Sequence, residues 1–463
     1  MSRKLVLVLV FLMLLVCLGY PRFQQNRVEA TNGYPVHNLN TGLNYTTIQE
    51  AIDASETLDG HTILVDPGIY YGKIILNKSL HLTGQDKETT IIDGNGTGKV
   101  IVVMADNTSV SNFTIQGGSW APYEIYSAIY VNSSNNIISD NILRNNRDYA
   151  VVLDSSSKNT VEDNVMTGNW RNCMLKDSTE NRLIGNKITE GNQECVVLWG
   201  SSNNRIESNL MSGGNCGVEL SEAYDNVIVG NVINHTIYGI EIDHSYRNSI
   251  YHNNFINKWI ALAYLFSYPG SNYFDNGLEG NYWGDYNGTD SNYDGLGDTP
   301  YVLDENNTDH YPLMGTFQSF NVSITPQSFG EVDVISNFTI SEVGLYEWLT
   351  TPNQYLQAGQ PFLRLLPVQE QNMTAGFCRM TLPNNILNTS EYIVLINMTP
   401  VIVNKLAISN DTQTTLYFTF DSSALDGIII VPEFTLFLVI PIFMIAALLA
   451  IILYKRRYMT RAL

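Results

Sequence analysis

An asparagine motif recurs through the middle of the chain and restricts its fold more than any other feature of the sequence. The motif reads Asn-x-apolar-x-x-Asn-x-apolar, and its copies follow one another at intervals of 22 or 23 residues. They begin at Asn136, Asn159, Asn181, Asn204, Asn226 and Asn248. A repeat of this length, with short β-type segments and no helical periodicity, is typical of one coil of a parallel β-helix. Successive coils would stack about 4.8 Å apart, each pairing with the coils above and below it.

The second asparagine of each motif has a predicted structural role. These residues are Asn141, Asn164, Asn186, Asn209, Asn231 and Asn253. We expect their side-chain amides to form a ladder inside a turn, because such a ladder satisfies the polar groups of a tight bend. The open first edge of the solenoid needs a cap, since unpaired strand edges aggregate. Residues 46–60 are predicted to form an amphipathic helix that supplies it.

Three segments before the repeat carry a resemblance to a known family. They are TTIQEAIDA at 46–54, DGHTILVDPGIYYGKIILNKSLHLTGQDKETTIIDGNG at 59–96 and SVSNFTIQGG at 109–118. Together with the repeat they resemble right-handed parallel β-helix proteins of the pectate-lyase-like class, in particular the branch named after NosD and the related carbohydrate-binding and sugar-hydrolysis repeats. The resemblance covers residues 40–315. It implies the fold, but one fold hosts lyases, hydrolases, binding proteins and adhesins.

The two ends of the chain predict export and anchoring. Residues 5–18 are apolar and follow Arg3 and Lys4, so residues 1–30 are expected to be a signal peptide or an N-terminal anchor. Residues 434–453 are apolar without interruption and precede a basic cluster, which is typical of a transmembrane helix with its tail inside the cell. The body between them would then lie at the cell surface. Asn-x-Ser/Thr sequons at Asn44, Asn95, Asn132, Asn287, Asn337 and Asn397 agree with a glycoprotein.

Composition argues against nucleic acid as a partner. The formal net charge is −20, and basic residues cluster only at the ends of the chain. Phosphate binding needs clustered Lys and Arg.

The strands that follow each motif predict one candidate functional face. Period-two alternation, counted from the last apolar residue of each strand, assigns side chains to the core or to solvent. The inward set is Val151, Cys173, Val196, Val218 and Ile240, with Leu153, Leu175, Leu198, Leu220 and Ile242. The outward columns are Val152, Met174, Val197, Glu219 and Glu241, and Asp154, Lys176, Trp199, Ser221 and Asp243. Glu219 and Glu241 would therefore lie on adjacent coils, with Asp243 on the same face.

Three interpretations of this face stay open. Carboxylates about 5 Å apart push their pKa values apart, as in glycoside hydrolases, so Glu219, Glu241 and Asp243 are catalytic candidates. Elimination by a lyase would instead need a basic residue over the sugar, and Lys176 and Arg247 are the nearby candidates. The second interpretation is glycan binding without chemistry, and the third is an acidic surface without a ligand. The substrate-binding candidates are Trp199, whose ring offers an apolar face to a sugar, together with Lys176, Asp154, Tyr246 and Arg247.

Two metal ions are candidates for binding. Copper is implied only by the NosD resemblance, and it would need clustered His, Met or Cys. In the predicted register Cys173 and Cys216 point inward while Cys195 points the other way, so the thiols would be buried and inert. Calcium is suggested by the oxygen-ligand spacing of Asp290, Asn292, Asp294 and Asp298, with Gly295 permitting the turn.

The alternative to a calcium loop is a turn that closes the solenoid, with Trp283 and Tyr311 packed over the last coil. Beyond it, residues 317–430 alternate between apolar and polar positions and are expected to form a β-sandwich stalk. Residues 431–463 form the predicted anchor. Its Pro432-Glu433-Phe434 sequence resembles the sorting signals that archaeosortases process, and a plain single-pass anchor is the alternative.

The sequence therefore predicts an all-β protein of the archaeal cell surface: a right-handed parallel β-helix, a β-sandwich and a C-terminal membrane helix. Its expected partner is a polysaccharide or surface glycan, or a surface-layer protein in an adhesive role. Cleavage of the polysaccharide by hydrolysis or elimination, and delivery of copper, are the alternatives.

Overall fold

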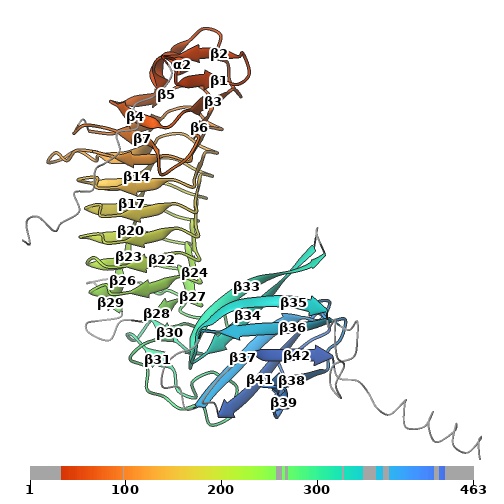
Figure 1. Cartoon of the computed structure of the whole chain (residues 1–463). Helices are drawn as coiled ribbons and strands as arrows, with labels where there is room; N and C mark the ends of the chain where they lie inside the picture. The colour runs from red at the N-terminus through yellow and green to blue at the C-terminus, as the bar shows by residue number, and fades with distance from the viewer. Residues whose placement is uncertain are drawn as a thin grey trace, which may run out of the picture. The chain divides into compact units, whose positions relative to one another are not determined.

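The computed structural model describes residues 33–96, 98–256, 263–265, 270–325, 328–347, 361–368, 375–421 and 427–432. The chain divides into two compact units, residues 1–174 and 175–463. Figure 1 labels their helices and strands. The predicted signal segment and the apolar run of the predicted anchor lie outside the described residues. Within the described part of the chain, no helix is long and apolar enough to cross a membrane.

The first unit begins with the predicted cap, in a different form. Strand β1 (Val36–Asn38) pairs antiparallel with both β2 (Leu43–Tyr45) and β3 (Thr62–Val65). The predicted helix over 46–60 is only the single short helix α2 (Ile48–Asp53), which begins with a capping box between Thr47 and Glu50. A hairpin and a helix therefore both cover the open edge of the first coil.

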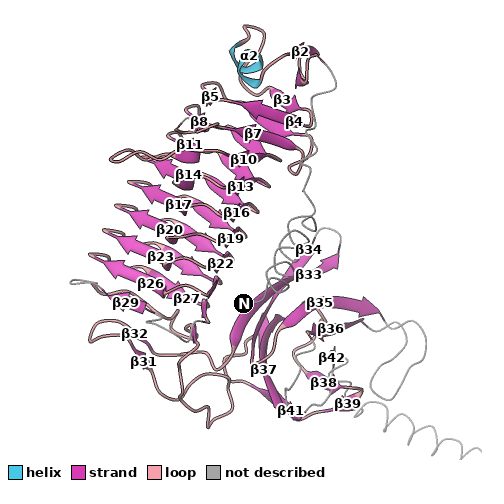
Figure 2. Cartoon of the chain, turned by 60° about the vertical axis from the view of Figure 1, so that its left-hand side comes forward, coloured by secondary structure: helices cyan, strands magenta, loops and turns pink. Residues whose placement is uncertain are grey.

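Three parallel sheets follow in the first unit (Figure 2). Sheet A continues from β3 through β6 (His81–Gly84), β9 (Ser109–Ser111), β12 (Ile137–Ser139) and β15 (Thr160–Glu162). Sheet B contains β4 (Gly68–Tyr71), β7 (Thr90–Asp93), β10 (Thr114–Gln116), β13 (Ile142–Arg144) and β16 (Val165–Thr167). Sheet C contains β5 (Ile74–Leu76), β8 (Ile101–Val103), β11 (Ser127–Val131) and β14 (Tyr149–Asp154).

The second unit repeats this three-sheet arrangement. Its sheet A contains β18 (Arg182–Ile184), β21 (Arg205–Glu207), β24 (Val227–Val229) and β27 (Ser249–Tyr251). Its sheet B contains β19 (Lys187–Thr189), β22 (Leu210–Ser212), β25 (Val232–Asn234), β28 (Asn254–Phe255) and β30 (Tyr282–Trp283). Its sheet C contains β20 (Glu194–Trp199), β23 (Cys216–Ser221), β26 (Tyr238–Asp243) and β29 (Ala263–Leu265). The predicted parallel β-helix is confirmed.

The asparagine ladder is also present. In the second unit each amide nitrogen donates to the next side-chain oxygen, from Asn186 to Asn209, Asn231, Asn253 and Asn281, over 2.9 to 3.0 Å. The first asparagine of each motif forms a second ladder that the sequence analysis did not predict, from Asn181 through Asn204, Asn226 and Asn248 to Asn272. Because each nitrogen also donates to a backbone carbonyl, the amides satisfy the bends of the coils internally.

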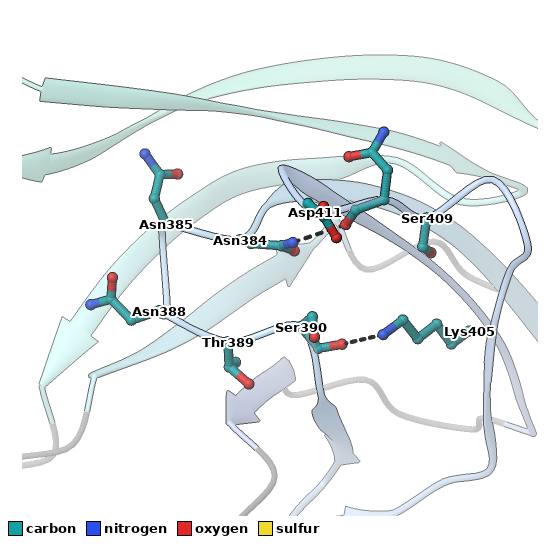
Figure 3. Close-up of a pocket in the computed structure, with 9 residues that line it drawn as sticks. Asn384, Asn385, Asn388, Thr389, Ser390, Lys405, Ser409 and Asp411 are labelled. Atoms are coloured by element: carbon teal, nitrogen blue, oxygen red, sulfur yellow. Dashed lines mark hydrogen bonds between the residues drawn. The ribbon is translucent and has the colours of Figure 1, made fainter.

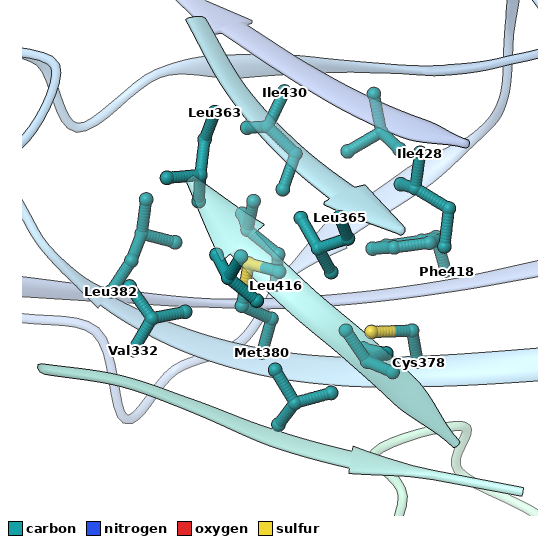
Figure 4. Packing of buried hydrophobic residues seen from close by; sticks show 14 of the residues in the cluster. Val332, Leu363, Leu365, Cys378, Met380, Leu382, Leu416, Phe418, Ile428 and Ile430 are labelled. Atoms are coloured by element: carbon teal, nitrogen blue, oxygen red, sulfur yellow. The ribbon is translucent and has the colours of Figure 1, made fainter. Parts of the chain in front are cut away.

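Two five-stranded antiparallel sheets follow the solenoid in the second unit. One contains β33 (Thr316–Thr325), β34 (Ser328–Ser336), β37 (Ala375–Pro383), β41 (Gln413–Asp421) and β40 (Val403–Lys405). The other contains β35 (Ile340–Glu347), β36 (Pro361–Pro367), β42 (Ile428–Pro432), β38 (Tyr392–Ile396) and β39 (Thr399–Pro400). Buried side chains from both sheets, among them Leu363, Met380 and Ile430, form one apolar cluster (Figure 4). This is the layered architecture that the alternating pattern predicted.

A buried charge network connects the last coils to the sandwich strand β37. Arg379 donates to Glu279 over 2.8 Å and 2.7 Å, and the second carboxylate oxygen of Glu279 lies 2.9 Å from His252. The His252 ring stacks on Phe317 with 4.0 Å between ring centroids. Of the two aromatics predicted to close the solenoid, Trp283 is buried between Phe255 and Tyr301, whereas Tyr311 is 38% exposed.

Candidate functional site

The outward face of sheet C in the second unit brings the predicted carboxylates together. Strand pairing places Val197, Glu219 and Glu241 opposite one another on β20, β23 and β26. The neighbouring column contains Trp199, Ser221 and Asp243. The register that alternation predicted for these two columns is therefore the observed register.

A third carboxylate and a thiol join this face, and the sequence analysis missed both. Glu194 pairs in register with Cys216, which pairs with Tyr238. The thiol of Cys216 lies close enough to Glu241, Glu219 and Glu194 for all three to raise its pKa, in addition to the effect of burial. The prediction that Cys216 points into the core is therefore wrong.

Gly217 gives the reason for the error. A Cβ atom at this position would lie 2.6 Å from Ile233 Cγ2, which is inside the coil, and 2.6 Å from the Gly239 carbonyl oxygen. Val218, next in the chain, is also buried in the core. Two consecutive inward positions interrupt the alternation and turn residue 216 outward. Cys195, at the position of Gly217 one coil earlier, was predicted to point away from the core but is fully buried.

The outward column is much less exposed than alternation implies. Val152, Met174 and Val197 were predicted to face solvent and are all buried. A side chain in such a column has its counterparts about 4.8 Å away on the coils above and below, so its neighbours cover it. Glu241 is likewise only 7% exposed.

Burial and charge set the acidity of Glu241. Desolvation, the charge of Glu219 and the charge of Glu194 together raise the pKa of Glu241 from 4.5 to about 7. Its carboxylate makes no hydrogen bond to any residue in the described part of the chain. A carboxyl group that titrates near neutral pH beside other carboxylates can exchange a proton with a ligand or hydrogen-bond to it.

Aromatic side chains occur a few residues after these carboxylate positions along the chain. Trp199 is 46% exposed, two positions along β20 from Val197. In the turn after β23 and β26, Tyr224 and Tyr246 stack with ring centroids 5.6 Å apart. Arg247 lies over the Tyr246 ring at 4.7 Å and is held by two hydrogen bonds to Asp225, at 2.7 and 2.6 Å. These exposed rings can support the apolar faces of sugar rings.

The remaining predicted site residues have local partners. Lys176 lies 3.0 Å from Asp177, and Asp243 lies 2.8 Å from His244. Asp154 belongs to the first unit, where it accepts a hydrogen bond of 2.6 Å from the Tyr130 hydroxyl. Lys176 and Arg247, the bases that elimination would need, are therefore each engaged by an aspartate.

The predicted calcium loop is closed by its own hydrogen bonds. Asp290 accepts the backbone N–H groups of Asp294 and Gly295, both at 2.9 Å, and Asp298 accepts that of Ser291 at 2.8 Å. Asn292 donates to Asp294 over 3.1 Å. Across the described ranges, no three His, Cys, Asp or Glu side chains come together in a way that could hold a metal ion. The alternative prediction, a turn that closes the solenoid, accounts for these contacts.

The donors expected for copper do not fit a copper site either. The thiols of Cys173, Cys195, Cys216 and Cys378 are all fully buried, and burial raises the pKa of each. A thiol must lose its proton to bind a metal, so these environments oppose ligation. His252 is held between Glu279 and Phe317.

The sandwich carries a hollow that the sequence analysis did not predict (Figure 3). It has a volume of about 540 Å³ and is lined entirely by polar side chains, including Asn384, Thr389 and Asp411. Lys405 donates to the Ser390 carbonyl over 2.9 Å across it. Asn388 and Asn410 on its rim are exposed and belong to Asn-x-Ser/Thr sequons, so this hollow lies in a surface suited to glycosylation.

Comparisons with known proteins agree with the fold. The model of a family described as "Periplasmic copper-binding protein (NosD)" matches residues 54–219 and 196–288. A cell surface glycoprotein of Methanothermus fervidus is 43% identical over 84 residues, which is 18% of this chain and 14% of that protein. The chain thus spans about a seventh of this relative's length.

The solved structures that match this chain do so at low sequence identity. An alginate lyase from Paenibacillus is 13% identical with a TM-score of 0.42, covering 51% of this chain and 94% of that one. The enzymatically active domain of tailspike protein 2 from bacteriophage CBA120 is 12% identical with a TM-score of 0.40, covering 80% of this chain and 75% of that one.

Proposed function

Because the chain belongs to the NosD family, and because the region matched by that family carries the carboxylate face, we propose that it binds extracellular polysaccharide through sheet C of its second unit. One observation carries the proposal: Glu219 and Glu241 lie in register beside the exposed Trp199. Rigid parallel strands hold these groups at a fixed spacing, and a solenoid offers an extended surface to a linear polymer.

The proposal includes a location at the cell surface. The similarity to a cell surface glycoprotein and the exposed sequons support an extracytoplasmic body. Residues 1–30 would direct export, and residues 431–463 would anchor the chain in the membrane, either as a plain span or after processing at the Pro-Glu-Phe sequence. The sandwich would act as the stalk, with contacts to surface-layer proteins as a further role.

Retention on immobilised polysaccharides tests the binding proposal. The full chain in detergent is passed over neutral, acidic and amino-sugar polymers, beside Trp199→Ala and Glu222→Ala. Glu222 is an exposed carboxylate in the turn after β23, so its substitution controls for a general change in charge. We expect the Trp199 variant to lose at least tenfold in affinity for the retained polymer and the Glu222 variant to bind as wild type. Equal retention of both variants would remove this face from the proposal.

Cleavage of the polysaccharide is the second candidate function, and the near-neutral pKa of Glu241 favours it. With Glu219 on the adjacent strand, Glu241 would act as general acid while Glu219 acts as nucleophile or base. The test is the appearance of new reducing ends when the full chain is incubated with the polymer that it retains. Cleavage that is lost in Glu241→Gln while retention persists would establish an enzyme, whereas retention without new ends would establish a binding protein.

A further inference from the structure

We infer that the polysaccharide bound at this face carries protonated amino groups, so that the ligand is an amino-sugar polymer rather than a polymer of uronic acids. The inference rests on the proposed function and names the substrate class of the same site. It depends on three properties of the face: its charge, the buried carboxylate of Glu241 and the aromatic ring beside it.

The charge of the face opposes an acidic polymer. Glu194, Glu219 and Glu241 occupy three successive strands, and the effects of Glu219 and Glu194 on Glu241 show that their fields overlap. Uronate groups would bring like charges into contact with these carboxylates, an arrangement that costs several kcal/mol at an interface. An ammonium group would instead meet complementary charge.

The state of Glu241 points to a missing donor. The residue is only 7% exposed, and no described residue donates a hydrogen bond to its carboxylate. Buried polar groups normally have a partner, because an unpaired one costs the full penalty of its desolvation. The primary ammonium of an amino sugar supplies up to three donors and a positive charge. A neutral sugar could donate through hydroxyl groups but would leave the charge uncompensated.

The neighbouring ring favours a sugar over other cations. Trp199 lies one column from Glu219 and is 46% exposed, so a pyranose ring can rest on it while its amino group reaches the carboxylates. A lysine side chain of a protein partner would present the charge without such a flat apolar face. A metal ion needs several ligands at once, and no such group exists among the described side chains.

The test compares two oligosaccharides that differ only at nitrogen. Glucosamine hexamer and N-acetylglucosamine hexamer have the same backbone, but acetylation removes the charge and two donors. Oligogalacturonate and polylysine serve as the acidic-sugar and charge-only probes. Binding to the full chain is followed by calorimetry near pH 7, for wild type, Glu241→Gln and the control Glu222→Gln.

We expect the glucosamine hexamer to bind at least tenfold more tightly than the acetylated hexamer, and Glu241→Gln to abolish that preference while the Glu222 variant keeps it. Gln retains the shape of Glu and removes the charge, so loss of folding does not confuse the result. Equal binding of both hexamers, tighter binding of oligogalacturonate, or polylysine binding as tightly as the glucosamine hexamer would each overturn the inference and leave polysaccharide binding standing. Failure of every oligosaccharide to bind would instead reject the proposed function itself.

Discussion

Replacing Glu241 by Gln should stabilise the protein in neutral and alkaline solution. The pKa of Glu241 is raised from 4.5 to about 7, so the folded state holds its proton more tightly than the unfolded chain does. The contribution of Glu241 to the free energy of unfolding therefore has its full value below about pH 4.5. It decreases as the pH rises towards 7 and is constant above that. The charges of Glu219 on β23 and Glu194 on β20 act on Glu241, and the Cys216 thiol on β23 lies near all three carboxylates.

The size of the effect follows from the two pKa values. Each tenfold change in the ionisation equilibrium corresponds to about 1.4 kcal/mol, so a pKa near 7 in place of 4.5 costs the folded state roughly 3 kcal/mol at pH 8. Gln has no charge to bury and avoids this cost. For a domain of this size, each kcal/mol changes the melting temperature by about 2 to 4 °C, so we expect Glu241→Gln to melt several degrees higher at pH 8.

Thermal unfolding of the full chain between pH 4 and pH 8 measures the effect as the difference between variant and wild type. The difference should be close to zero at the acid end and grow as the pH rises, whereas Glu222→Gln should match wild type within about 0.5 kcal/mol throughout. Hydrogen exchange at β26 would locate the change. A Glu241→Gln variant that is less stable than wild type at pH 8 would refute the reasoning, since it would mean that the carboxylate has a favourable partner.

Three further substitutions test the fold. Asn209→Ala removes the donor to Leu183 and Asn231 and leaves several buried groups unpaired, so we expect a loss of roughly 3 kcal/mol or more in urea unfolding, and an unchanged midpoint would contradict the ladder. Arg379→Met should cost about 3 to 5 kcal/mol by leaving the buried Glu279 without its guanidinium partner and with His252 alone, and adding Glu279→Gln should recover much of it. Because the network lowers the pKa of Glu279 to about 2, its stabilisation should be present above about pH 4.5 and disappear as the pH falls towards 2. Thr47→Ala should cost about 1 kcal/mol through the loss of the α2 cap, measured as a lower melting temperature of the first unit.

Several elements could be predicted because their cause is local and repeated. The spacing of Asn186, Asn209 and Asn231 fixes one coil, and the apolar residue two positions after each points inward. The alternation that ends at Leu220 and Ile242 then gave the register of Glu219 and Glu241 correctly. Such patterns can be predicted because every coil packs its core with the same residue types at the same positions.

Other features of the site could not be predicted in the same way. Counting back from Leu220 assumed an unbroken alternation, and two inward positions at Gly217 and Val218 moved Cys216 to the opposite face. A steric restriction of this kind depends on Ile233 and Gly239, which belong to other strands. The pairing of Arg379 with Glu279 likewise joins residues 100 positions apart.

The sequence by itself determined the coil length, the ladder of the second asparagine of each motif and the register of the two glutamates, because these depend on contacts that recur at a fixed interval. Only the tertiary structure decided that the outward Glu241 is buried, that Glu194 and Cys216 join it, and that its carboxylate has no hydrogen-bond partner among the described residues. The physical reason is that exposure and acidity are set by the atoms that surround a side chain. In a stacked solenoid those atoms come from the neighbouring coils. The repeat motif does not fix which side chains those coils carry at the outward positions.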